Sequence, residues 1–231
     1  MQYENLLKKL KSMSNPEAVK GMARYGINPK NNLGVSISKL RPIAKEIGKD
    51  HDLALKLWSS GIHDARLLAC FIEDPAKATG EQMDSWARDF DSWDVCDQAC
   101  TSLFDLTPLA WKKVFEWAKC DEEFVKRAAF SIIAGLAVHD KKAGDKEFEQ
   151  FSSLIKKHSI DDRNYVKKAV NWALRNIGKR NLTLNKQMIK LSKEIRKIDS
   201  KSAKWIARDA IRELSSEKVQ NRLVEKEGKG K

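Results

Sequence analysis

Apolar residues recur at intervals of three and four positions along nearly the whole chain, and this spacing predicts amphipathic α-helices. Helix start signals accompany the pattern. Asn15-Pro16-Glu17 combines an N-cap residue with a proline at the first helical position, and Thr79 with Gln82 has the spacing of a capping box. Two further start signals are Thr107-Pro108 and Asp121. No segment reads as a convincing strand, so we expect an all-α fold of about a dozen helices.

Short polar or glycine-containing segments are expected to separate these helices. They lie at residues 26–36, 48–50, 61, 74–75, 91–92, 105–107, 140–144, 159–161 and 178–181. A chain of 231 residues can bury a sizeable core and is more typical of one extended domain than of two. We expect a single domain over residues 1–224. Residues 225–231 are charged and contain glycine, which predicts a frayed tail.

A weak internal repeat organises the predicted helices. Four segments share a mixture of apolar residues, basic residues and alanine, and they span residues 64–69, 124–129, 165–170 and 205–210. With the helix around Asp97 counted among them, the anchor positions are 30 to 41 residues apart, which is typical of two-helix solenoid repeats. The second helices of stacked pairs line the concave face of such a solenoid. We therefore expect one groove to contain the five anchors Arg66, Asp97, Arg127, Lys168 and Arg208.

The charge balance favours polyanionic partners. Lys and Arg number 44 against 32 Asp and Glu, and the formal net charge is +12. No apolar run is long enough to span a bilayer, and the N-terminal residues lack the layout of a signal peptide. We therefore expect a cytoplasmic protein that does not associate with membranes.

The cysteines predict no metal site. Cys70, Cys96, Cys100 and Cys120 lie in apolar, helix-like surroundings without CxxC pairs, so we expect reduced thiols in the core. Cys96 and Cys100 are four residues apart, but no histidine or further cysteine completes a zinc set. A glycine-rich phosphate loop is also missing from the sequence, and no cofactor is expected.

The segment Trp93-Asp94-Val95-Cys96-Asp97 is the strongest chemical signal in the sequence. Its spacing places an indole ring and a carboxylate on one face of a helix, where together they suit a cationic ring. In a basic protein, nucleic acid is the obvious source of such a ring. A structural interpretation stands beside this one: Trp93 is one of seven tryptophans that could pack between helices, and Asp97 could pair with a neighbouring lysine or arginine.

Several motifs, in the same order and at similar spacing between about residues 16 and 214, resemble the DNA alkylation repair family of HEAT-like alkylpurine DNA glycosylases, of the AlkC/AlkD type. The motifs are Met22-Ala23-Arg24-Tyr25, Leu33-Gly34-Val35, Trp93-Asp94-Val95-Cys96-Asp97, Arg127-Ala128-Ala129 and the segment from Val166 to Arg175. The resemblance implies a HEAT-like solenoid that hydrolyses the N-glycosidic bond of cationic lesions such as 7-methylguanine and 3-methyladenine. It further implies that the reaction needs no metal and leaves the lesion in the duplex.

The resemblance also implies roles for individual residues. Asp97 matches the catalytic aspartate, Trp93 and Trp172 match two aromatic clamps on the deoxyribose of the lesion, and Arg127 matches an arginine that contacts phosphate. Arg175 and Tyr25 match positions on the DNA surface. Ser92 departs from the pattern, because a second tryptophan precedes the clamp in a relative, and this leaves the substrate range open.

The expected protein is a monomeric, monofunctional DNA glycosylase whose partner is duplex DNA containing alkylated bases. Two alternatives remain open at the level of sequence. One is a non-catalytic nucleic-acid-binding module, and the other is a protein-interaction scaffold that holds an acidic peptide in the groove. Binding to duplex DNA should depend steeply on salt for the first but not for the second.

Overall fold

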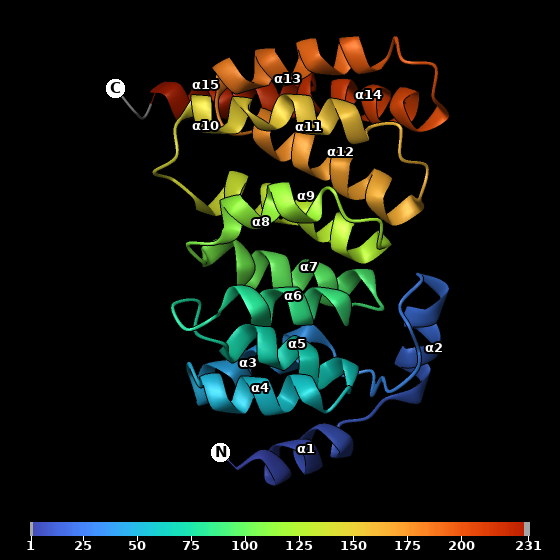
Figure 1. Ribbon diagram of the computed structural model, residues 1–231, viewed down its shortest axis with the longest axis vertical. Helices are drawn as coiled ribbons and strands as arrows, with labels where there is room; N and C mark the ends of the chain where they lie inside the picture. The colour runs from blue at the N-terminus through green and yellow to red at the C-terminus, as the bar shows by residue number, and fades with distance from the viewer. Residues whose placement is uncertain (1, 229–231) are drawn as a thin grey trace. The chain divides into compact units, whose positions relative to one another are not determined.

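The computed structural model describes residues 2–228 and is helical throughout (Figure 1). These residues form fifteen α-helices and one 3₁₀ helix, and none of them lies in a β-strand. The Cα positions divide the chain into two compact units, Met1–Ala110 and Trp111–Lys231, each of which has its own core. The all-α prediction is confirmed.

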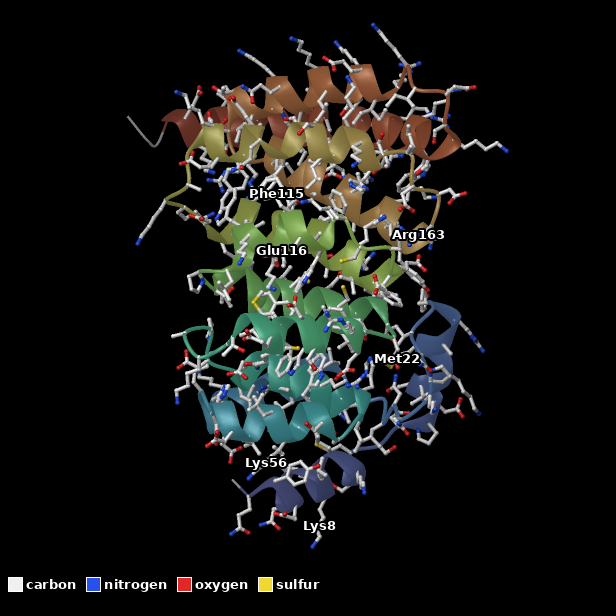
Figure 2. All side chains as sticks on the ribbon, in the orientation of Figure 1. Lys8, Met22, Lys56, Phe115, Glu116 and Arg163 are labelled. Carbon is white, nitrogen blue, oxygen red and sulfur yellow. The ribbon has the colours of Figure 1, made fainter. Side chains whose placement is uncertain are left out.

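Unit 1 is built from consecutive short helices. They are α1 (Tyr3–Ser12), α2 (Pro16–Arg24), α3 (Ile37–Ile47), α4 (His51–Ser59), α5 (His63–Ile72), α6 (Gly80–Arg88), α7 (Trp93–Ser102) and the 3₁₀ helix η1 (Phe104–Leu106). Helix α5 is central because it packs against α3, α4 and α7, and most of its side chains are buried. The Trp58 and Trp86 rings stack beside it with centroids 4.0 Å apart, and both are buried. Charged side chains such as Lys8 extend outward from the helices (Figure 2).

The described part of unit 2 is built from eight helices of five to seventeen residues. They are α8 (Ala110–Trp117), α9 (Glu123–His139), α10 (Asp145–Glu149), α11 (Phe151–His158), α12 (Asn164–Gly178), α13 (Leu182–Ile195), α14 (Lys201–Leu214) and α15 (Glu217–Gly228). Helix α12 packs along α9 and also contacts α13 and α14. Asn176 strengthens the first of these interfaces by donating its side-chain amide to the Ala134 carbonyl at 3.0 Å.

The predicted helix starts have mixed outcomes. The Asn15 side chain accepts a hydrogen bond from the Ala18 backbone, as expected for an N-cap followed by proline. Thr79 also caps its helix, but the Gln82 side-chain amide donates to Glu73 and its Oε1 accepts no hydrogen bond from the Thr79 N–H, so half of the predicted capping box is wrong.

Thr107 does not cap the next helix, because its hydroxyl group donates to the Phe104 carbonyl and α8 begins at Ala110. Helix α9 begins at Glu123, close to the start signalled at Asp121, but no side chain caps it. Additional breaks, among them residues 196–200 and 215–216, raise the number of helices above the predicted dozen.

Part of the predicted tail is helical. Helix α15 continues to Gly228, so residues 225–228 are helical, whereas residues 229–231 lie outside the described part of the chain. Three cysteines are buried free thiols as expected, and burial raises the pKa of Cys70 and Cys100. Cys120 is a free thiol too, but it is only partly buried. Between residues 2 and 228, no helix combines the length and the apolar character needed to cross a membrane.

Candidate nucleic-acid interface

Trp93 and Asp97 lie on one face of α7, as their spacing predicts. Both side chains are partly exposed, whereas Val95 and Cys96 between them are buried in unit 1. Thr101 continues the same stripe one turn later and donates its hydroxyl group to the Asp97 carbonyl at 2.8 Å. The buried face of α7 therefore anchors a helix whose other face presents an indole ring and a carboxylate.

A segment distant in the sequence holds the Trp93 ring in place. The indole N–H donates to the Tyr25 carbonyl at 3.0 Å, across 68 residues of chain. The Asn28 backbone N–H donates to Ser92 Oγ at 2.8 Å, and its side-chain amide donates to Asp91 at 2.9 Å. Tyr25 itself is 79% exposed, so its ring is accessible close to Trp93. Ser92, which departs from the family pattern, thus holds this segment against the start of α7.

Asp64 fixes the other end of the same segment. Its carboxylate is fully buried and accepts hydrogen bonds from the backbone N–H groups of Leu33 and Val35, both at 2.7 Å. Gly34 between them has a φ of +73°, and a Cβ there would lie 2.4 Å from the Asn15 carbonyl oxygen. The Leu33-Gly34-Val35 motif therefore requires glycine for its backbone conformation and for close packing.

A buried histidine–aspartate pair beside this segment was missed in the sequence analysis. His63 Nε2 lies 2.9 Å from Asp94 Oδ2, and the two residues are only 4% and 6% exposed. Burial by itself lowers the pKa of His63, but the hydrogen bond to Asp94 and the charges of Asp94, Asp64 and Asp91 outweigh it and raise the pKa. The signal was available, because His63 and Asp94 are 31 residues apart, the same step as from Arg66 to Asp97.

This pair predicts a pH-dependent contribution to stability. Because the pKa of His63 is raised on folding, the protonated side chain stabilises the folded protein. This contribution to the free energy of unfolding is complete below about pH 6.5 and is lost as pH rises through the higher pKa of His63 in the folded protein. We expect His63→Gln to reduce the free energy of unfolding more at about pH 5.5 than at about pH 8.5. Denaturant titrations at both pH values would measure the difference.

His158 provides the control for this prediction. Burial and the charges of Lys126 and Lys157 lower its pKa, so the wild-type protein loses stability at this site as pH falls. The effect of His158→Gln should therefore change with pH in the direction opposite to that of His63→Gln. A His63→Gln effect that is constant over the pH range would contradict the proposed charged pair.

In unit 2, the predicted residues Lys168, Trp172 and Arg175 share one face of α12. Lys168 is exposed and Trp172 is partly exposed. Arg175 forms ion pairs with Glu213 and, at 3.7 Å, with Asp209. These carboxylates compensate much of its positive charge.

Two other predicted cations are engaged within the protein. Arg127 is only 5% exposed and donates a hydrogen bond from Nη1 to the Tyr165 carbonyl at 2.6 Å, which links α9 to α12. Arg66 lies over the Trp58 ring and donates to the Asp89 carbonyl at 3.0 Å. Arg208, in contrast, is exposed on α14. The DNA contacts expected of these residues stay predictions, as does the expectation that the five anchors share one groove.

The structure thus brings together Tyr25, Trp93 and Asp97 in unit 1, and Lys168, Trp172 and Arg175 in unit 2. The packing interpretation of the tryptophans holds for Trp58, Trp86 and Trp117, which are buried. Trp93 and Trp172 are partly exposed, and their role as clamps on the lesion stays a prediction.

Relatives of the chain include two proteins that carry no assigned activity. The uncharacterized protein Lmo0209 of Listeria monocytogenes is 25% identical over 134 residues, which cover 56% of this chain and 60% of the relative. The uncharacterized protein Lin0241 of Listeria innocua is 24% identical over the same shares of the two chains. The match therefore spans less than two thirds of these relatives.

A solved structure shares the fold over nearly the full length. It is described as a new family of proteins related to the HEAT-like repeat DNA glycosylases with affinity for branched DNA structures. The TM-score is 0.77 with 18% sequence identity, over 93% of this chain and 96% of the other. The chain therefore has an all-α, HEAT-like repeat fold. A sequence model of the family described as DNA alkylation repair enzyme matches residues 6–214, and because this covers most of its length, the chain belongs to that family.

Proposed function

We propose that this protein removes cationic alkylated purines, of the 7-methylguanine and 3-methyladenine type, from duplex DNA by hydrolysing the N-glycosidic bond. The observation that carries the proposal is the partly exposed pair of Trp93 and Asp97 on α7, with the indole held by the Tyr25 carbonyl. Membership of the DNA alkylation repair family supports it. The activity needs no metal or cofactor, and we place it on a cytoplasmic monomer.

The chemistry of the lesion fits this small set of groups. An alkylated purine already carries a positive charge, so the bond from C1′ to the base breaks with its electron pair moving to the purine, which leaves neutral. Positive charge then develops on the sugar, where a fixed carboxylate such as Asp97 stabilises it electrostatically. Water adds to C1′ and loses a proton. The face of Trp93 would contact the sugar and the cationic base, and we also assign Trp172 of unit 2 the role of an aromatic clamp that the family resemblance implies.

The positive charge of the chain supplies affinity for DNA. A net charge of +12 favours the release of condensed counterions from the duplex. Lys168 and Arg208 are exposed and suited to phosphate contacts, and we also assign DNA contacts to Arg66, Arg127, Arg175 and Tyr25. Arg66 is partly exposed beside its internal hydrogen bond, whereas Arg127 is only 5% exposed and would contact phosphate through that small surface alone.

Incubation with a methylated duplex tests the proposal. We expect release of free 7-methylguanine and 3-methyladenine, identified by mass spectrometry, and abasic sites in the remaining DNA. A duplex without lesions should release nothing. Tight binding to DNA without any base release would reject the glycosylase activity.

A non-catalytic role on branched DNA is the second candidate. It is favoured by the fold shared with a protein that has affinity for branched DNA structures. Comparison of a four-way junction with a duplex of the same length would separate the two functions. A preference for the junction without base excision would support this role, whereas a salt-independent interaction would point to a protein-interaction scaffold.

A further inference from the structure

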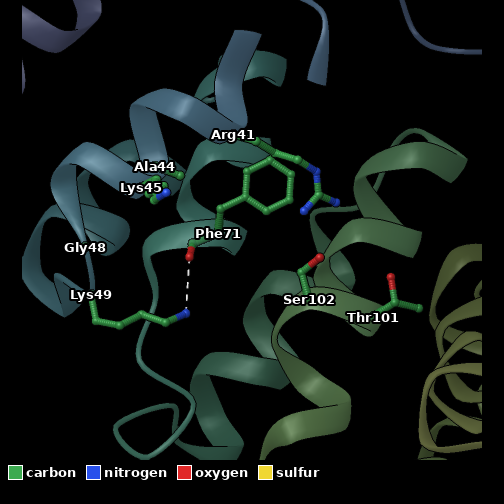
Figure 3. Close-up of a pocket in the computed structure, with 8 residues that line it drawn as sticks. All are labelled: Arg41, Ala44, Lys45, Gly48, Lys49, Phe71, Thr101 and Ser102. Carbon is green, nitrogen blue, oxygen red and sulfur yellow. Dashed lines mark hydrogen bonds between the residues drawn. The ribbon is translucent and has the colours of Figure 1, made fainter. Parts of the chain in front are cut away.

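A basic pocket lies in unit 1 between α3, α5 and α7 (Figure 3). Its volume is about 490 Å³. The residues that line it are Arg41, Ala44, Lys45, Gly48, Lys49, Phe71, Thr101 and Ser102. None of these lining residues is acidic, and three of them are cationic.

The cations are held by different contacts. The guanidinium group of Arg41 lies 4.8 Å from the centre of the Phe71 ring, and its Nη2 is 3.4 Å from Gln98 Oε1. Stacking of this kind orients the planar donors of arginine while leaving its edge accessible. Lys49 donates to the carbonyls of Phe71 and Glu73 at the end of α5, at 3.2 and 2.8 Å. Lys45, which also lines the pocket, is exposed.

Two carboxylates near the pocket, Glu46 and Glu73, are engaged with other groups. Glu46 on α3 lies 3.5 Å from Lys9 of α1. Glu73 accepts hydrogen bonds from His51 at 2.8 Å and from Gln82 at 2.6 Å. The lining itself therefore carries positive charge without a carboxylate to compensate it. An uncompensated positive charge favours the binding of an anion.

The pocket also continues the face of α7 that carries Trp93 and Asp97. Thr101 lies one helical turn beyond Asp97, which corresponds to about 6 Å along the helix axis. Consecutive phosphates of one DNA strand are about 3.4 Å apart along the duplex axis, so 6 Å corresponds to about two nucleotides.

We propose that this pocket binds a phosphodiester group of the DNA backbone within about two nucleotides of the lesion. The charged edge of Arg41 and the Lys45 ammonium group would contact the phosphate oxygens. The Ser102 hydroxyl, which donates to Gln98 Oε1 at 3.4 Å, lies in the same lining. The Phe71 ring and the Ala44 methyl group give the adjoining deoxyribose an apolar surface. This inference rests on the proposed action on DNA and specifies how unit 1 holds the strand beside Asp97.

Salt-dependent binding to an undamaged duplex tests the pocket independently of catalysis. We expect Arg41→Gln/Lys45→Gln to flatten the dependence of log affinity on log salt by about 1. For one lost contact, the affinity ratio of wild type to variant should shrink about 3.5-fold between 50 and 200 mM salt. Arg41 also packs on Phe71, so its replacement could disturb folding. The single variant Lys45→Gln avoids this problem, because Lys45 is exposed.

Lys8→Gln/Lys39→Gln is the matched control. It also removes two positive charges from unit 1, but from exposed positions on α1 and α3 that lie outside the pocket lining. If the control and the pocket variant flatten the salt dependence equally, the pocket contributes only diffuse charge and the proposal is wrong.

Single methylphosphonate substitutions locate the phosphate. Each replaces one charged phosphodiester by a neutral group along the lesion strand. At the position bound by the pocket, the substitution should weaken binding by the wild type but not by Arg41→Gln/Lys45→Gln, as in a double-mutant cycle. If the methylphosphonate and the protein variant weaken binding additively at every position within three nucleotides of the lesion, the assignment is wrong. If the wild type shows this position-specific loss of binding but releases no base, the glycosylase proposal is rejected and the phosphate site in the pocket is supported.

Discussion

Replacement of Asp97 by asparagine is expected to lower the rate of base release at least about a hundredfold, because the variant keeps the shape of the side chain but loses the charge that opposes the developing cation. Affinity for duplex DNA should stay level or rise, since an anion leaves a surface that faces DNA. Single-turnover release from a 7-methylguanine duplex, run beside a fluorescence binding titration, measures both quantities. Rate and affinity should thus change independently.

Asp52→Asn is the control for this experiment. Asp52 is exposed on α4 of the same unit, so its replacement makes the same change in charge away from α7. It should leave the excision rate unchanged. An Asp97→Asn variant that excises at the wild-type rate would remove Asp97 from the mechanism, whatever the family relationship.

The second large effect is expected at Asp64. Asp64→Ala leaves the backbone N–H groups of Leu33 and Val35 without their acceptors in a fully buried site, which should reduce the free energy of unfolding by about 2 to 4 kcal/mol. Asp64→Asn should also destabilise, because one of the two donors would face an amide NH₂ group. Denaturant titrations of both variants would measure the loss.

Asp64→Ala should also loosen the segment that holds the Trp93 indole through the Tyr25 carbonyl. Excision by the folded protein should therefore slow as well. Asp52→Ala, at an exposed position in the first turn of α4, is expected to change stability by less than about 1 kcal/mol. If Asp64→Ala were as stable as this control, the bonds from Leu33 and Val35 would not be important for the fold.

Local patterns in the sequence were sufficient for the helical class and for part of the candidate site. Periodicity predicts helices because residues three and four apart meet on one face whatever surrounds them. The shared face of Trp93 and Asp97 follows from the same geometry. The Asn15 cap was predictable for a similar reason, since a cap bonds to the backbone only three residues away.

Competition between partners limited the other local predictions. Gln82 has the spacing for its Oε1 to accept from the Thr79 N–H, but its Nε2 donates to the charged Glu73 carboxylate, and this contact orients the side chain instead. The Thr107 hydroxyl bonds to Phe104 and not to the following helix. Folding brings Glu73 to Gln82 across nine residues, whereas the Phe104 carbonyl is a local acceptor three residues before Thr107.

By itself the sequence determined the all-α class, the basic character and the placement of Trp93 with Asp97 on one helix face. Tertiary structure alone decided that the Tyr25 carbonyl holds Trp93 and that His63 pairs with Asp94. It also decided that three helices enclose a basic pocket. The physical reason is distance along the chain. Helix geometry sets contacts between near neighbours, whereas hydrogen bonds across tens of residues form only where packed helices exclude water and bring buried polar groups together.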